Sequence, residues 1–310
     1  MTHNAVVPVE PALPAIAGEW SDADRAALAR AVLALERPGL AARLSAVVGR
    51  PLDMIGKALP APLTDAVARG TEAAMRAALR VALATMPKER LPSEPAPEPA
   101  GTFRLSRFPG RLRTPEFGHR ALAAASGAIG GAFGLATLAV ELPVSTTIML
   151  RAIADIARRE GEDLSDPETA LACVQVFALG GRGGVTLADS GYFAVRGALA
   201  RTMTEASRVL VQRGLADEAT PALLRFAAQV AGRFGVVVSQ KAAAQAVPVI
   251  GALGGAAINA AFLDHFQTVA AGHFTVRRLE RVYGREAVRD AYELERARLD
   301  GVPAGAAKAA

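Results

Sequence analysis

The chain has 310 residues, of which 51% are hydrophobic but only 5% aromatic. Because alanine supplies much of the apolar content and is the strongest helix former, the composition favours an all-α protein. Cys173 is the only cysteine, which excludes an intrachain disulfide and a cysteine-based metal site. The formal net charge of +5 is modest, and basicity alone does not choose between anionic lipid and nucleic acid.

The first third of the chain is expected to hold a tail, a helical segment and a linker. Residues 1–20 are rich in proline and alanine, and they predict a disordered tail without the pattern of a secretory signal, so we expect a cytoplasmic protein. Ser21 is a candidate N-cap followed by acidic residues, and it opens an N-terminal helical segment over 21–86. That segment includes a helix ended by Pro38 and an amphipathic helix over 64–86.

A linker is expected over residues 87–114. Seven prolines fall between 87 and 115, and the second half of the segment is rich in arginine. Its arginines are Arg104, Arg107, Arg111 and Arg113. A solvated linker is favoured over a phosphate-binding arm.

A helical domain is expected over residues 115–300, followed by a frayed tail at 301–310. Its centre is residues 121–150, a stretch with one charge, Glu141. A second stretch of the same style covers residues 242–263. Glycines at helical spacing lie in both stretches: Gly127, Gly130, Gly131, Gly134, Gly251, Gly254 and Gly255. Since glycine is costly inside a helix, these residues predict two central glycine- and alanine-rich helices that pack closely together.

Further helices follow from local signals. Pro143 is expected to kink or restart a helix that runs to Glu160, with Gly161 as its C-terminal cap. The sequence from Ser165 to Glu168 reads as a capping box opening a helix to about Leu179. The glycine-rich run at 180–184 predicts a turn, without the lysine of a phosphate loop.

The remaining segments read as three more helical regions. Helices are expected from Asp189 and over 221–245, and the strand-like run at 236–238 is too short to establish a sheet. Both signs of charge alternate over 273–299, which suits an exposed helix broken near Gly284. A row of charges four residues apart, formed by Arg151, Asp155 and Arg159, can pair along one helix.

The two apolar stretches also raise the question of a membrane. Residues 121–140 and 242–263 are uncharged and each is about as long as a membrane-spanning helix requires. Alanine and glycine dominate them, so the free energy of membrane insertion should be weak. Buried core helices are therefore favoured over transmembrane spans.

Catalytic candidates are few. Glu141 and Asp264 follow the two glycine runs at similar distances, so close helix packing could bring them to a similar depth. The favoured alternative is that each acid ends a buried helix and pairs with a nearby arginine. His265 completes a weak candidate site for a hydrolase.

Other chemistries find less support. His265 and His273 are eight residues apart, about 12 Å along a helix, which is too far to share one metal ion. We expect no metal and no cofactor. Cys173 lies in an apolar helical pattern and is interpreted as an inert core thiol. Nucleic acid is disfavoured because aromatic residues rarely accompany the arginines.

Several segments in the same order resemble the EcsC protein family. They are Gly130–Gly134 leading to Glu141–Pro143, Arg151–Ala157, Asp189–Phe193, Pro248–Gly255, Asp264–Phe266 and Gly272–Glu280. The resemblance covers about residues 115 to 290. It implies a bacterial, mainly helical protein of poorly defined function, and the operon that names the family also encodes an exporter, which suggests a role at the inner membrane. It supplies no catalytic residues.

These observations give three hypotheses for the function. The first is a non-catalytic interaction protein at or near the cytoplasmic membrane face, peripheral at the inner membrane, binding an anionic membrane surface, lipid or an exporter complex. In a variant of it, the helices enclose an apolar small molecule. The second is a hydrolase that uses Glu141, Asp264 or His265, and the third is an integral membrane protein. The oligomeric state stays open.

Overall fold

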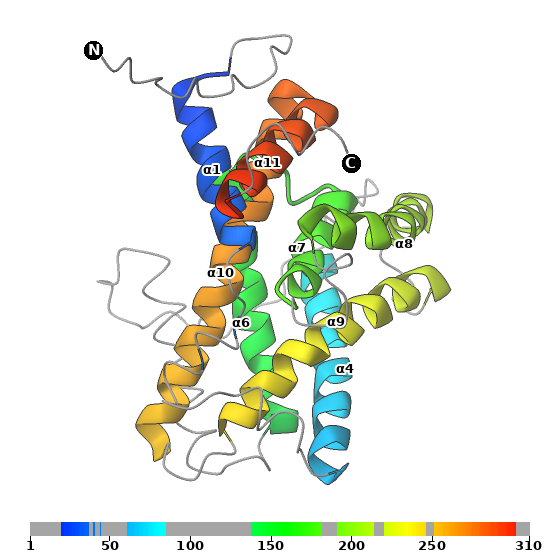
Figure 1. The fold of residues 1–310 in the computed structure, drawn as a ribbon. Coiled ribbons are helices and arrows are strands. Elements are labelled where there is room, and N and C mark those ends of the chain that lie inside the picture. The colour runs from blue at the N-terminus through cyan, green and yellow to red at the C-terminus, as the bar shows by residue number, and fades with distance from the viewer. Residues whose placement is uncertain are drawn as a thin grey trace, which may run out of the picture. The chain divides into compact units, whose positions relative to one another are not determined.

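The computed structural model describes residues 20–36, 40, 44, 61–84, 138–181, 191–213, 220–245 and 251–301. Within these ranges the chain forms eight helices and no strand, which confirms the all-α prediction (Figure 1). The helices are α1 (Asp22–Glu36), α4 (Ala61–Ala84), α6 (Leu138–Arg159), α7 (Pro167–Leu179), α8 (Tyr192–Arg213), α9 (Pro221–Gln245), α10 (Gly251–Tyr283) and α11 (Arg285–Leu299).

The chain divides into two compact units. Unit 1 comprises residues 1–37 and 271–310, and unit 2 comprises residues 38–270. The boundary falls inside α10, so this helix contributes its first twenty residues to unit 2 and the remainder to unit 1. The predicted division into a segment over 21–86, a linker and a domain over 115–300 stays a prediction.

Unit 1 is held by contacts between the start of α1 and the end of α10. The Ser21 hydroxyl accepts from the Asp24 backbone N–H at 3.1 Å, which confirms Ser21 as the N-cap of α1. The Asp24 carboxylate accepts from Arg278 and from the Tyr283 hydroxyl, each at 2.9 Å. The Trp20 ring stacks on the Tyr283 ring with centroids 4.3 Å apart. These contacts tie residues far apart in sequence into one unit.

Unit 2 is built around α7. Eleven of its 13 residues are buried, and the helix packs against α4, α6, α8 and α9. Its Cys173 is buried, as expected for a core thiol. An all-round apolar helix of this kind belongs in the centre of a helical domain, because no face of it is suited to water.

The predicted helix ends are partly confirmed. Gly161 has a φ of 78° and its N–H donates to the Arg158 carbonyl, while the Glu162 N–H donates to the Ala157 carbonyl. This pattern is a Schellman C-cap, as predicted. At the next helix the predicted cap is one residue off.

The N-cap of α7 is Asp166, whose side chain accepts from the Thr169 N–H at 3.0 Å. The capping-box pattern predicts Ser165 as the cap, but its N–H and hydroxyl donate to the Asp163 carboxylate instead. Pro167 explains the difference, since proline suits the first helical position, where no N–H is needed, and this position makes its predecessor the cap.

The helix expected over 221–245 is confirmed as α9, and the run at 236–238 lies inside it. Two expectations about element boundaries are wrong. Residues 242–263 do not form one helix, because α9 ends at Gln245 and α10 begins at Gly251. Residues 273–283 belong to α10, and His273, Phe274 and Leu279 there are buried rather than exposed.

Two predictions about helix breaks have different outcomes. The predicted break at Gly284 is confirmed by its φ of 88° and by the start of α11. The helix α6 continues through Pro143, so proline does not restart it.

The predicted close packing through glycines cannot be followed at most of the named positions. Gly127, Gly130, Gly131 and Gly134 lie outside the described residues, and the surroundings of Gly251 and Gly254 do too; Gly255 is buried in α10. Within the described ranges, close approaches occur at other glycines. A Cβ on Gly272 would lie 2.7 Å from Leu35 Cγ in α1, so glycine allows α1 and α10 to meet in unit 1.

Candidate functional site

A buried charge pair joins α6 and α9 in the core of unit 2. Lys241 Nζ donates to Glu141 Oε1 at 2.6 Å, and the two side chains are 0% and 6% exposed. Asn259 of α10 donates its amide N–H to the same oxygen at 2.9 Å. One carboxylate oxygen of Glu141 therefore accepts hydrogen bonds from side chains of two helices, α9 and α10. Among the described residues, this ion pair is the most deeply buried one.

The Lys241 ammonium also faces an aromatic ring. It lies 4.9 Å from the centroid of the Phe262 ring, within the range of a cation–π contact. Burial lowers the pKa of the Lys241 ammonium from 10.5, and the charge and hydrogen bond of Glu141 oppose that shift. The pair and the ring together replace the water that the ammonium would otherwise require.

The Phe262 ring belongs to a larger aromatic cluster. Phe177 of α7, Phe234 of α9 and Phe266 of α10 contact one another with centroids 5.1 to 5.6 Å apart. The Phe262 ring meets both Phe234 and Phe266. Three helices thus share an aromatic core directly beside the charge pair.

His265 contacts this aromatic cluster at Phe266, with ring centroids 5.1 Å apart. Its Nε2 is 2.9 Å from the Gly180 carbonyl oxygen, and because a carbonyl only accepts, Nε2 is the donor. The imidazole thereby caps the end of α7, where helical carbonyls are unsatisfied. This hydrogen bond gives His265 a structural role at the end of α7.

Gly180 and Gly181 allow this arrangement. A Cβ on Gly180 would overlap the Phe266 ring, and one on Gly181 would overlap the Arg233 carbonyl oxygen of α9. The run predicted as a turn therefore begins with two glycines pressed against α9 and α10. The rest of that run lies outside the described residues.

The three catalytic candidates do not form one constellation around Glu141. Glu141 bonds to Lys241 and Asn259, whereas His265 bonds to Gly180, about 9 Å further along α10 than Asn259. Asp264 is half-buried on α10, and its backbone carbonyl accepts from the Thr268 hydroxyl. The residue of α10 that reaches Glu141 is Asn259.

The prediction for Glu141 was close but named the wrong cation. Its partner is a lysine 100 residues away, not an arginine nearby. One signal in the sequence could have found it: Lys241 is one of only four lysines and follows an apolar run. A cation in such a run requires a buried anion, and Glu141 is the single charge of the other stretch.

In the charged row on α6, Asp155 accepts from Arg158, three residues on, at 3.3 Å. The pairing of Asp155 with Arg151 and Arg159 stays a prediction. Arg151 is exposed and borders a shallow apolar depression in unit 2, whose other lining residues are Val81, Ala82, Leu150, Ala154, Leu164, Ala170 and Cys173. The depression has a volume of about 30 Å³, room for about two water molecules and not for a lipid chain.

Within the described ranges, no group of three or more histidine, cysteine or carboxylate side chains could hold a metal ion. One helix in this part of the chain, α9, is long and apolar enough to cross a bilayer, with a mean hydropathy of 1.3 over its apolar window. A core helix of a soluble protein passes the same test.

The fold and the cluster define an all-α protein with a charge pair buried between helices. The chain matches the model of the EcsC protein family over residues 26–279. Since this match covers most of the sequence, the chain belongs to that family. The match starts well before residue 115, the approximate start of the region covered by the resemblance, so α1 and α4 are part of the family region. No curated protein and no solved structure matches the chain.

Proposed function

We propose that this protein is a non-catalytic interaction protein that associates reversibly with the cytoplasmic face of a membrane. The supporting observation is α9. It has 25 residues, and its exposed positions include the apolar residues Pro221, Leu224 and Ala228. This side of α9 leaves apolar surface available for a partner.

The buried charge pair favours peripheral association over a transmembrane span. Lys241 lies in the last turns of α9, where its ammonium is bonded to Glu141 within the protein. A transmembrane α9 would separate that lysine from Glu141 and leave the buried carboxylate without its cation. The contact therefore favours α9 remaining packed in unit 2 while its outer face meets the membrane.

Within the described residues, the surface also suits a membrane better than an enclosed apolar molecule. The shallow depression beside Arg151 is too small for a lipid chain. The exposed apolar side chains are dispersed over helix surfaces, and they include Val144, Val211 and Leu224 in unit 2. Side chains in such positions can enter the headgroup region without a preformed cavity.

Flotation of the purified full chain with liposomes tests this proposal. Vesicles of phosphatidylglycerol and phosphatidylcholine are compared with vesicles of phosphatidylcholine alone, each at low and at high salt. We expect flotation with the anionic vesicles at low salt, and a lower bound fraction at high salt because salt screens the arginines. Failure to float with anionic vesicles at low salt would refute membrane association and would direct the search to a protein partner such as an exporter complex.

A further inference from the structure

We infer that one face of the antiparallel pair α8–α9 binds the surface of a bilayer that carries acidic phospholipid headgroups. The residues of this hairpin face are Arg201, Arg208, Val211, Leu224 and Arg225. The inference rests on the proposed function, and it names both the surface of the protein and the chemistry of its partner.

On α8, the spacing of the residues creates the face. Arg201, Thr204, Arg208 and Val211 are separated by three, four and three residues, so they line one side of a helix. All four are exposed, and the exposed fractions are 90% for the Arg201 side chain and 70% for Val211. The opposite side of α8 holds buried Leu199, Met203 and Leu210.

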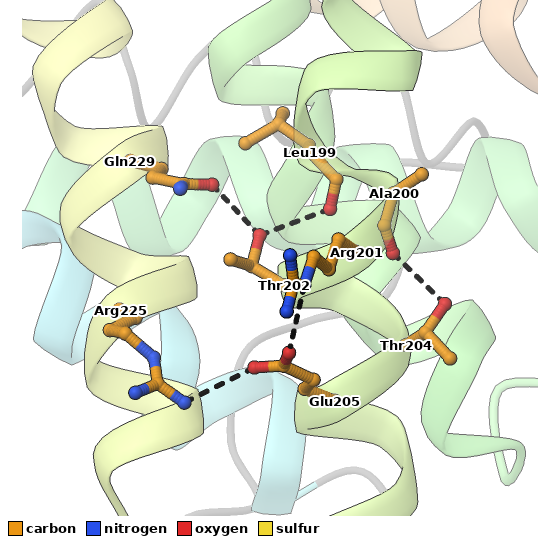
Figure 2. A network of polar contacts seen from close by, with 8 residues as sticks. All are labelled: Leu199, Ala200, Arg201, Thr202, Thr204, Glu205, Arg225 and Gln229. Atoms are coloured by element: carbon orange, nitrogen blue, oxygen red, sulfur yellow. Dashed lines mark hydrogen bonds and ion pairs between the residues drawn. The ribbon is translucent and has the colours of Figure 1, made fainter.

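The neighbouring helix α9 extends the same face. Thr202 donates to Gln229 at 2.8 Å, and Arg225 donates to Glu205 at 3.1 Å, so the two helices run antiparallel (Figure 2). In this register Leu224 lies opposite residues 206–207 of α8. Val211 is then about 7 Å further along the pair, which spreads two exposed apolar side chains over one surface.

Glu205 holds the arginines without burying them. Figure 2 shows its carboxylate between Arg201 and Arg225, at 3.3 and 3.1 Å. Both guanidinium groups stay largely exposed, so each ion pair contributes little and can give way to a phosphate. Guanidinium suits that exchange because its planar fork matches phosphate oxygens.

The charge of this part of the chain favours an anionic partner. Residues 192–245 hold seven basic and three acidic side chains, a net charge of +4 within a chain whose total is +5. Lys241 pairs with a buried acid, Glu141, from outside the segment. The positive charge that remains lies on the helices that carry the exposed apolar residues.

The composition of the face distinguishes a bilayer from a nucleic acid. Single-stranded nucleic acids are bound by arginines interleaved with aromatic side chains that stack on bases. The hairpin face has arginine beside valine and leucine, and none of its five residues is aromatic. Arginine beside aliphatic side chains fits phosphate headgroups above an acyl layer.

The test repeats the flotation with variants of the full chain. One variant carries Arg201→Ser, Arg208→Ser and Arg225→Ser, and a second carries Val211→Ser and Leu224→Ser. The matched control, with Arg281→Ser, Arg285→Ser and Arg289→Ser, removes three exposed arginines of unit 1. Circular dichroism and thermal unfolding establish that each variant keeps its fold, as expected for exposed positions.

The outcomes separate the inference from the proposed function. Each arginine of the hairpin face is expected to contribute about fivefold to the partition onto anionic vesicles, so the triple variant should bind about a hundredfold more weakly. The variant with Val211→Ser and Leu224→Ser should show weaker residual binding to vesicles at high salt. The control variant should bind like the wild type.

Wild-type flotation that the hairpin variants retain would overturn the assignment of the face and leave membrane association standing. Equal binding to vesicles without acidic lipid would overturn the headgroup chemistry. A wild-type chain that does not float would refute both proposals.

Discussion

Removing one member of the Glu141–Lys241 pair should destabilise unit 2 strongly. In Lys241→Met the Glu141 carboxylate stays buried with Asn259 as its remaining donor. In Glu141→Leu the Lys241 ammonium is left against the Phe262 ring with no anion. Both changes leave an uncompensated charged group in the core, because the two side chains are 6% exposed or less.

The size of the effect follows from the burial of the pair. Deleting one partner of a buried ion pair costs about 3–5 kcal/mol, whereas replacing both by apolar side chains of similar volume is often close to neutral. The double variant Glu141→Leu with Lys241→Met should therefore be much more stable than the sum of the single losses implies. At about 2–4 °C per kcal/mol, each single variant should unfold about 6–20 °C below the wild type.

Urea and thermal unfolding of the four proteins measure this as a double-mutant cycle. We expect a coupling free energy of several kcal/mol between the two positions. Single losses below about 1 kcal/mol, or losses that simply add, would refute the reasoning that the pair is buried and mutually dependent.

The pH dependence of stability provides a second readout of the same pair. The pKa of Lys241 in the folded protein is lowered from 10.5 by burial. Between the lowered value and 10.5 the unfolded chain binds more protons, so stability rises with pH in that window. The stability of the wild type relative to Lys241→Met should therefore increase as the pH approaches 10.5.

Two further predictions concern the packing of each unit. Gly180→Ala should destabilise the fold by about 1–3 kcal/mol, because its Cβ would overlap the Phe266 ring. The control Gly232→Ala should be neutral or stabilising by up to about 1 kcal/mol, because nothing lies within 4 Å of its Cβ. Equal effects of the two substitutions in urea unfolding would contradict the close approach at Gly180. The hydrogen bond from Arg278 is the main cause that lowers the pKa of Asp24 below 3.8, so its contribution to stability is present above pH 3.8 and lost as the pH falls through the lowered value. Asp24→Asn should remove that part of the acid sensitivity, as followed by circular dichroism, and an unchanged acid transition would show that Asp24 contributes nothing.

Much of the local structure could be predicted because its causes are local. The cap at Ser21, the end at Gly161 and the break at Gly284 depend on a few neighbouring residues. At the start of α7 the predicted N-cap, Ser165, is wrong by one position, because the cap is Asp166. Pro167 indicates the correct cap, since proline favours the first helical position and its predecessor is then the N-cap.

The candidate site could be predicted only in part, because its contacts join residues about a hundred positions apart. The burial of Glu141 follows from the apolar stretch around it, but its partners depend on how α9 and α10 are rotated about their axes. The same limit applies to the glycines. Gly180, Gly181 and Gly272 make close contacts with other elements, and no periodicity within their own segments reveals what lies opposite them.

The helix α9 combines two roles that experiments can separate. The buried side of its second half holds Phe234, Val237, Val238 and Lys241. Leu224 and Arg225 in its first half are exposed. Lys241 and Arg225 are 16 residues apart, about 24 Å along the helix axis.

Substitutions at that separation should act independently, so Lys241→Met should cost the same free energy of unfolding, to within about 0.5 kcal/mol, with or without Arg225→Ser. Conversely, Arg225→Ser should weaken vesicle binding without changing stability. A non-additive result in urea unfolding would mean that the exposed face and the buried pair are coupled, and binding at one end of α9 would then bias the packing at the other.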